Sequence, residues 1–152
     1  MSGIKGGDLA INGNVNLVGD RKVILLVEGG DLYIKGLVNL ESPGVGFFMT
    51  LVGKDVNGQK GNIIVDPSVT HPTEPSLEGM YLSDGQFRTG AGSSKLWVKG
   101  AVVAYGGVQF QRDLGGGTST APAELFEYNP ALLFTYPREL TRKNMTWKEV
   151  AP

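Results

Sequence analysis

The stretch GDLAINGNVNL at residues 7–17 is written again, with few changes, as GDLYIKGLVNL at residues 30–40. The second copy begins 23 residues after the first, and both copies share the opening Gly-Asp-Leu, an isoleucine, a second glycine and the closing Val-Asn-Leu. Self-similarity of this kind is typical of a structural unit that is repeated along a chain. The repeat therefore predicts that the two stretches adopt the same local structure.

Each copy alternates apolar residues with other residues, as Leu9 and Ile11 do in the first copy. This period of two is typical of a β-strand with one buried face. The glycine in the middle of each copy, Gly13 or Gly36, falls where two short strands meet. Glycine suits such a corner because it has no Cβ atom. Each unit is thus predicted to be a strand, a corner and a second strand.

Two further segments resemble these units. The segment KLWVKGAVVA at residues 95–104 is interpreted as another copy, and GNIIVDPSV at residues 61–69 as a looser one with Pro67 at the corner. In the first of them, three residues align with those of the second copy: Leu96, Val98 and Gly100 with Leu32, Ile34 and Gly36. In the looser copy, three residues are expected to point inward: Ile63, Val65 and Val69.

Short strands with glycine corners predict an all-β fold, a right-handed parallel β-helix (β-solenoid) of about five or six coils. We expect a single domain, with the solenoid over residues 1–121 and an irregular C-terminal tail over residues 122–152 that packs on its flank. An antiparallel β-sandwich is the rival fold, because Asn57-Gly58 is a strong hairpin signal. The in-register repeats favour the solenoid.

The runs VILLV at residues 23–27 and FFMTLV at residues 47–52 are apolar nearly throughout. Strands of this composition are typically covered on both faces. We therefore expect other parts of the protein to pack on the outside of these two strands.

Composition excludes several classes of function. The chain of 152 residues has a formal net charge of -1 and a pI of about 5.8, which does not suit a nucleic-acid binder. There is no cysteine, so disulfides and cysteine metal sites are excluded, and the single histidine, His71, cannot form a histidine-rich metal site. We expect no cofactor, and neither a secretory signal nor a membrane-spanning segment is recognisable.

Catalysis of polysaccharide cleavage would need paired carboxylates, for which Asp66, Glu78 and Asp84 are the candidates. Asp66 precedes a proline and Asp84 precedes a glycine, which is ordinary turn chemistry, so we predict no enzymatic activity. The oxygen-bearing side chains between Asp55 and Asp66 partly follow the spacing of a calcium loop, but the glycine is one position late. A plain loop is the better interpretation.

Outward residues suggest a surface that could bind a partner. If the aligned copies stack, Tyr33, Ile64 and Trp97 form an exposed stripe, and Tyr105 is a further candidate. One interpretation is a platform for a sugar or a protein partner. The other, which we favour, is that the apolar tail folds back over this stripe and buries it.

Several segments together resemble bacterial cell-surface proteins of the type IV pilus-associated, minor-pilin-like group: GDLxIxGxVxL, AVVAYGG at residues 101–107 and PAELFEYNPALLF at residues 122–134. The coils alone are also similar to bactofilin-type polymer-forming proteins. The first resemblance implies an extracellular or cell-surface location, a non-enzymatic structural or display role and neighbouring domains of a parent protein as partners.

Two alternatives remain open at this point. The first is an adhesion or carbohydrate-binding module that uses the outward aromatic residues to bind a glycan or a host-cell partner. The second is a bactofilin-like cytoskeletal polymer, built by end-to-end self-association of the coils.

Overall fold

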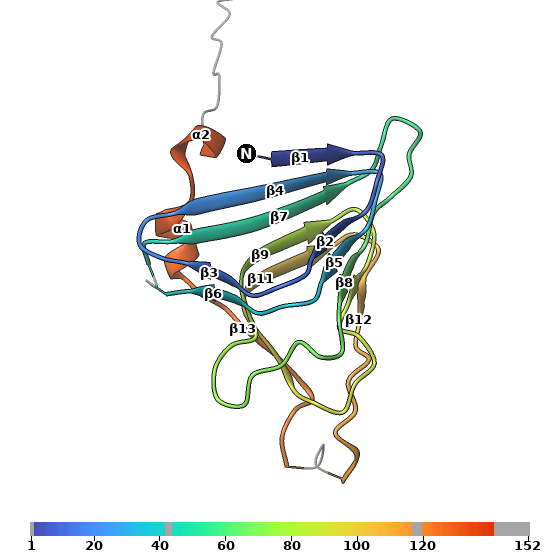
Figure 1. Ribbon diagram of the computed structural model, residues 1–152, viewed down its shortest axis with the longest axis vertical. Coiled ribbons are helices and arrows are strands. Elements are labelled where there is room, and N and C mark those ends of the chain that lie inside the picture. The colour runs from blue at the N-terminus through green and yellow to red at the C-terminus, as the bar shows by residue number, and fades with distance from the viewer. Residues whose placement is uncertain (1, 42–43, 117–119, 142–152) are drawn as a thin grey trace, which may run out of the picture.

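The computed structural model describes residues 2–41, 44–116 and 120–141 of the chain, which wind into a parallel β-solenoid of about five turns (Figure 1). Every strand ladder within these ranges is parallel. The solenoid prediction is thereby confirmed and the antiparallel sandwich is excluded. Asn57-Gly58 lies in the loop between two parallel strands instead of in a hairpin.

The strands in chain order are β1 Ser2–Lys5, β2 Leu9–Ile11, β3 Val15–Leu17, β4 Lys22–Glu28, β5 Leu32–Ile34, β6 Val38–Leu40, β7 Phe47–Gly53, β8 Ile63–Val65, β9 Leu77–Ser83, β10 Phe87–Arg88, β11 Leu96–Ala104, β12 Val108–Gln109 and β13 Glu124–Glu127. Two short helices follow, α1 Ala131–Thr135 and α2 Arg138–Thr141.

The strands form three faces, each crossed once per turn. The first face holds β1, β4, β7 and the second halves of β9 and β11, and the second face holds β2, β5, β8, β10 and β12. The third face holds β3, β6, the first halves of β9 and β11, and β13. Both long strands bend at glycines with positive φ, Gly79 (129°) and Gly100 (150°). A Cβ atom on Gly100 would collide with the carbonyl oxygen of Gly79, so glycine is required at this bend.

The second face confirms three of the four predicted copies. One inward column runs its whole length: Leu9, Leu32, Ile63, Phe87 and Val108. The middle members of this column are fully buried, and so is Ile34 beside them. The looser copy at residues 61–69 is therefore a true repeat, with Val69 buried as expected.

The register predicted for residues 95–104 is wrong. Leu96 and Val98 lie on the third face, where Val98 pairs with Leu77 of the preceding turn, and Leu77 in turn pairs with Val38. The error has a physical cause. The alternation of apolar and polar residues is the same on every face, because it only separates inward from outward side chains. Corner glycines also follow strands on more than one face. The local sequence pattern therefore does not reveal the face to which a strand belongs.

One corner of the solenoid is built from stacked small and polar residues. Its glycines form a column, one per turn: Gly7, Gly30, Gly61, Gly85 and Gly106. The residue after each of the first three glycines links consecutive turns. Asp8 accepts a hydrogen bond from the amide of Asp31 at 2.8 Å, Asp31 accepts one from the amide of Asn62 at 2.7 Å, and Asn62 accepts one from the amide of Gln86 at 2.9 Å. These side chains satisfy the backbone amides where the strand ladders are interrupted.

The C-terminal segment contributes the last turn and then runs back along the stack. β13 pairs with the first half of β11, and α1 lies at the starts of β4 and β7, with α2 near β1 (Figure 1). Leu132 is buried, and the ring of Tyr136 contacts that of Phe47 edge-on at a centroid distance of 5.6 Å. Packing of the tail on the flank is thereby confirmed through Tyr136, and residues 142–152 lie outside the described residues.

Thr50 places a polar hydroxyl group in the apolar interior of the solenoid. Its side chain is fully buried on β7 beside Tyr81, and within the described part of the chain its hydroxyl has no hydrogen-bond partner. Because an unpaired buried hydroxyl loses its hydration without compensation, Thr50→Val should raise the free energy of unfolding by about 1 kcal/mol. Urea denaturation followed by circular dichroism measures this change.

Thr89 provides the matched control, because it is equally buried but donates a hydrogen bond to Glu124 at 2.9 Å and accepts one from the amide of Gln111 at 2.8 Å. Thr89→Val should lower the free energy of unfolding by about 2 kcal/mol. Equal effects of the two substitutions would contradict this account.

Candidate functional site

A shallow groove of about 290 Å³ opens on the outer side of the second face. It is lined by Tyr33, Lys35, Ile64, Asp66 and the loop that contains Gly90, together with the neighbouring residues of these segments. The groove thus combines an aromatic ring, an aliphatic side chain, an ammonium group and a carboxylate.

The strand ladder places the two apolar residues of the groove side by side. Tyr33 is the middle residue of β5 and Ile64 the middle residue of β8, and they are paired directly. Both point outward because their neighbours along each strand, such as Leu32 and Ile63, are fully buried inside the solenoid. This adjacency was predicted from the repeat.

The charged residues of the groove follow the same two strands. The amide of Asp66 donates a hydrogen bond to the carbonyl of Ile34 at 2.8 Å, which extends the ladder to this position. The Ser68 hydroxyl and amide donate to the Asp66 carboxylate at 2.6 and 2.9 Å and lower its pKa, with Lys35 acting in the same direction. At neutral pH the groove therefore holds a fixed negative charge close to a lysine.

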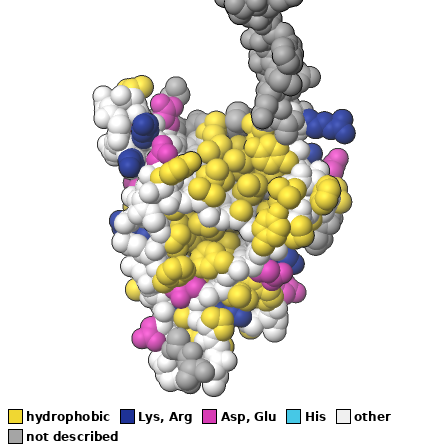
Figure 2. All heavy atoms as spheres, turned by 180° about the vertical axis from the view of Figure 1, so that it is seen from behind, with side chains coloured by type: hydrophobic (Ala, Val, Ile, Leu, Met, Phe, Trp, Pro, Cys, Tyr) yellow, Lys and Arg dark blue, Asp and Glu magenta, His cyan; other side chains and the backbone are white. Residues whose placement is uncertain are grey.

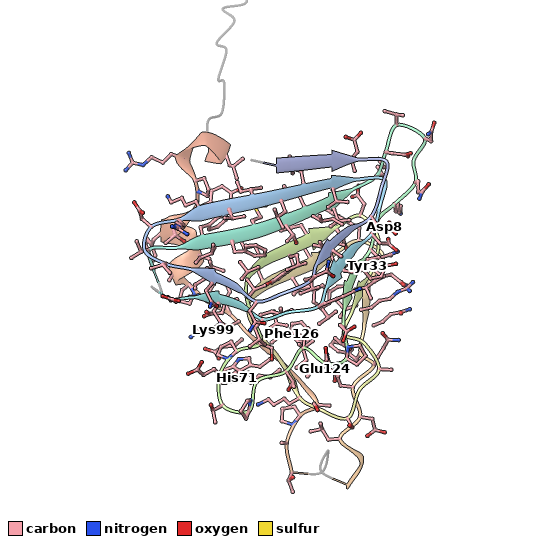
Figure 3. All side chains as sticks on the ribbon, viewed as in Figure 1. Asp8, Tyr33, His71, Lys99, Glu124 and Phe126 are labelled. Atoms are coloured by element: carbon pink, nitrogen blue, oxygen red, sulfur yellow. The ribbon has the colours of Figure 1, made fainter. Side chains whose placement is uncertain are left out.

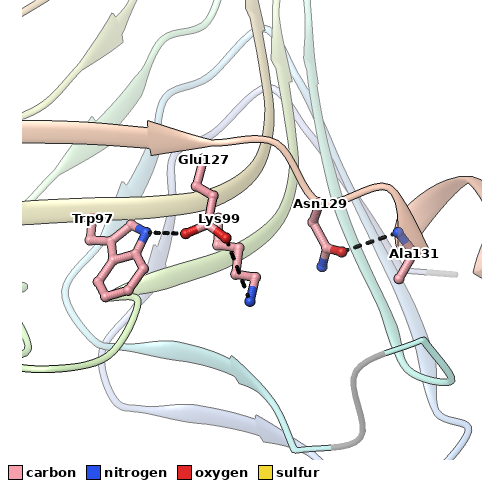
Figure 4. A network of polar contacts seen from close by, with 5 residues as sticks. All are labelled: Trp97, Lys99, Glu127, Asn129 and Ala131. Carbon is pink, nitrogen blue, oxygen red and sulfur yellow. Dashed lines mark hydrogen bonds and ion pairs between the residues drawn. The ribbon is translucent and has the colours of Figure 1, made fainter.

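The predicted stripe does not include Trp97, which is a correction. On the second face the neighbour of Ile64 is Arg88, whereas Trp97 lies on the third face beside Leu125. Its indole donates a hydrogen bond to Glu127 at 3.1 Å, and Lys99 lies 3.8 Å from the other oxygen of that carboxylate (Figure 4). Trp97 therefore helps to hold β13 against β11.

Tyr105 also lies apart from the groove. Its side chain is 80% exposed, and it lines a separate hollow of about 200 Å³ with Leu51, Gly53, Leu82 and Asp84 on the outside of the first face. The four surface residues singled out in the sequence are thus divided among three places: Tyr33 with Ile64, Trp97, and Tyr105.

Burial of the stripe by the tail is also a wrong expectation for Tyr33 and Ile64. Both side chains remain partly exposed, and the lining of their groove comes from β5, β8 and the loops near Pro67 and Gly90. The tail instead contacts the start of β7 at Phe47. Its path follows from β13, which joins the third face and directs the following residues away from the second.

Three of the carboxylates considered for catalysis or calcium binding accept hydrogen bonds from backbone amides. Asp84 accepts a hydrogen bond from the amide of Lys54 at 3.0 Å, and Glu78 accepts one from the amide of Leu40 at 2.7 Å. Asp55 accepts hydrogen bonds from the amides of Asn57 and Gln59 at 2.9 and 2.8 Å, as in an ordinary Asx turn. Within the described ranges, no three histidine or acidic residues are grouped as metal ligands.

His71 lies in the loop between β8 and β9, away from Tyr33 (Figure 3). Its Nδ1 accepts a hydrogen bond from the amide of Glu74 at 3.0 Å, so the ring supports the loop.

Sequence reasoning missed a buried polar cluster around Arg112 and Glu124. The Glu124 carboxylate accepts a hydrogen bond from the amide of Arg112 at 2.7 Å, and the guanidinium of Arg112 contacts backbone carbonyls of two other loops. Both residues lie outside the repeated units, and no local pattern marks them. Only the fold brings these loops together.

At the C-terminal end of the stack, the interior of the last turn opens into a hollow of about 320 Å³ lined by Val98, Val102, Val108, Phe110 and Phe126, among others. Phe110 and Phe126 are 65% and 38% exposed. Such an open end is the feature on which end-to-end assembly would depend.

Comparison with known proteins adds no assignment: no protein-family model matches the sequence, no curated protein matches it and no solved structure matches it. Within residues 2–41, 44–116 and 120–141, no helix has the length and apolar character needed to cross a bilayer.

Proposed function

We propose that this protein is a rigid, non-enzymatic structural or display module of a bacterial cell-surface or pilus-associated protein. The observation that carries the proposal is the uninterrupted interior of the five turns, in which Leu32, Ile63 and Phe87 occupy one fully buried column. A module of this kind keeps its two ends at a fixed separation, which is what a spacer or a display element requires.

Hydrogen bonding between turns supports this mechanical role. Each inner strand is paired with a strand of the turn before and the turn after, and the corner side chains Asp8, Asp31 and Asn62 continue the links between the ladders. Separating two turns would break all of these bonds together. The expected partners are neighbouring domains of the parent protein.

Location on the outside of the cell is the decisive test. An antibody raised against the module should label intact cells of the source organism, and added protease should remove the signal without lysis. Labelling only after permeabilisation would overturn the proposal. A cytoplasmic protein of known location, probed in the same cells, is the control for intact membranes.

Glycan binding in the groove of Tyr33 is the second candidate function. Carbohydrate sites commonly combine an aromatic face with a few polar groups, and here Tyr33 lies beside Lys35 and Asp66 in one groove. Trp97 and Tyr105 do not contribute to it.

A glycan array followed by calorimetry tests this candidate. Tyr33→Ala should lower the affinity for any glycan found by about tenfold, the effect of one stacking contact of 1.4 kcal/mol. Trp97→Ala and Tyr105→Ala are matched aromatic controls and should leave it unchanged. Absence of binding by the unaltered protein, or equal losses in all three variants, would reject the groove.

A further inference from the structure

The outer side of the first face is apolar although no described segment covers most of it. Eight outward positions lie in register on four neighbouring strands: Ile24, Leu26, Met49, Leu51, Met80, Leu82, Ala101 and Val103. These strands contain the two apolar runs that predict cover on both sides. The expectation of cover on both sides is confirmed at the start of β7, where Phe47 and Met49 are 0% and 4% exposed and the ring of Tyr136 contacts Phe47. It is wrong for the other outward apolar positions of these two strands, which stay partly exposed.

The other two faces are different. On the second face, outward Tyr33 and Ile64 are followed by the polar Arg88 and Gln109. On the third face, outward Trp97 and Leu125 lie among Asn39, Lys99 and Glu127. Figure 2 shows a broad gathering of hydrophobic side chains on the side of the molecule opposite to that in Figure 1. An outer surface that is apolar across four neighbouring strands is thus found on the first face, whereas the other two faces mix apolar and polar outward residues.

The size of the apolar area can be estimated from strand geometry. Two strands of seven residues and two half-strands of four, about 4.8 Å apart and at about 3.3 Å per residue, cover roughly 350 Å². An area of this size lies within the range of the largest, often functional, patch on a monomer. Buried on both copies it gives roughly 700 Å² in total, the size of a weak, reversible contact.

Charge at the two ends of β4 indicates what covers this area. Its outward row reads Lys22, Ile24, Leu26 and Glu28, with a base at one end, an acid at the other and apolar residues between them. A two-fold axis parallel to the stack places two copies face to face with their strands antiparallel. The row then complements itself, because Lys22 of each copy meets Glu28 of the other.

Shape at the two ends agrees with the same axis. At the start of β7 the tail stands on Phe47, with Leu133 and Phe134 66% and 88% exposed. At the end of β7 lies the hollow of about 200 Å³ that contains Gly53, a residue with no side chain to fill it. In a two-fold pair the projecting tail of one copy lies at the hollow of the other.

We propose that the outer side of the first face is the interface of a two-fold homodimer of this chain. The contact buries the seven partly exposed positions of this set, all but the already buried Met49, against their counterparts and sets the two stacks side by side. This inference is independent of the location of the protein in the cell.

Sedimentation velocity over a wide range of concentration should show a reversible monomer–dimer equilibrium. Leu82→Glu, which places a charge in the middle of the face, should leave only monomer. Ile64→Glu is the matched control, an outward apolar residue on the second face, and should leave the dimer unchanged. Circular dichroism confirms that each variant is folded.

Charge reversal provides a test that leaves the apolar positions intact. K22E and E28K should each weaken self-association about tenfold, because each creates two like-charged contacts at the edge of the interface. A mixture of the two variants should form heterodimers, since each copy then carries charges complementary to those of the other, and the double variant K22E/E28K should regain the original affinity.

Three outcomes would overturn the proposal. The first is a monomer at all concentrations, and the second is an association that neither Leu82→Glu nor charge reversal alters. The third is an open-ended series of oligomers, which would place the contact at the ends of the stack, where Val108 and Phe126 line the terminal hollow.

Discussion

Arg112→Met is expected to lower the free energy of unfolding by about 3 kcal/mol, the cost of breaking a buried, charge-assisted set of hydrogen bonds. The side chain is 6% exposed. Its Nε donates to the carbonyl of Thr89 at 2.9 Å, Nη1 to that of Pro67 at 2.7 Å, and Nη2 to that of Asp66 at 3.0 Å. Methionine fills a similar volume but leaves these carbonyls buried without donors.

The arginine stays charged in this position. Burial lowers its pKa, while the negative charges of Glu124 and Asp66 raise it, and the ordinary value is so high that the guanidinium remains protonated at neutral pH. Arg112 therefore acts as a cationic tie between the loops that follow β8, β10 and β12.

Two control substitutions separate this role from a general effect of removing an arginine. Arg112→Lys should restore little stability, because an ammonium on a flexible chain cannot reproduce a planar guanidinium that bonds to two other loops at once. Arg88→Met should have a small effect, since the guanidinium of Arg88 donates its hydrogen bonds to the side chain of Gln86, two residues away, and does not join separate loops. Urea denaturation gives the free energies, and hydrogen exchange should show faster exchange in residues 66–70 first. Full stability of the lysine variant would refute the account.

Gly61→Ala is expected to destabilise the solenoid by about 3 kcal/mol through overpacking at the corner column. The φ angle of Gly61 is one that alanine can adopt, so the effect does not come from backbone conformation. A Cβ atom at this position would collide with the carbonyl oxygen of Gly30 and approach Cγ1 of Val52 to 2.6 Å. The turns would have to separate locally to make room.

Gly7→Ala is the matched control, because Gly7 belongs to the same corner but has open space where its Cβ would lie. Its effect should be within about 0.5 kcal/mol of zero, as for other unconstrained surface substitutions. The difference between the two variants, measured by thermal and urea denaturation, isolates the close approach of the turns. Equal effects would show that stacking at this corner is looser than the structure indicates.

Much of the fold could be predicted because a repeated sequence pattern indicates a repeated local structure. The alternation at Leu9 and Leu32, with their preceding Gly-Asp pairs, correctly indicated strands that stack in register. The later copies at Phe87 and Val108 were harder to recognise, since the aspartate is replaced by Gln86 or Gly107 and only the glycine and the inward apolar residue remain.

The candidate site could be predicted only in part. Pairing of Tyr33 with Ile64 follows from the repeat, and the structure confirms it. The contribution of Asp66 depends on the Ser68 hydrogen bonds of a corner turn, and the exclusion of Trp97 depends on a change of face. Trp97 lies on β11, which follows the corner formed by residues 89–95, so a segment that resembles β5 in sequence begins one face later in the turn.

By itself, the sequence determined which side chains point inward and that the chain winds in parallel turns, because the period of two and the corner glycines act between near neighbours. Only the tertiary structure decided which face each strand joins and which outward residues are covered. Strand partners depend on the lengths of the intervening loops, and cover depends on the path of the tail after β13. The sequence around Leu51 and Leu82 is apolar and therefore predicts a buried surface. That these two side chains lie on a partly exposed face follows only from the whole fold.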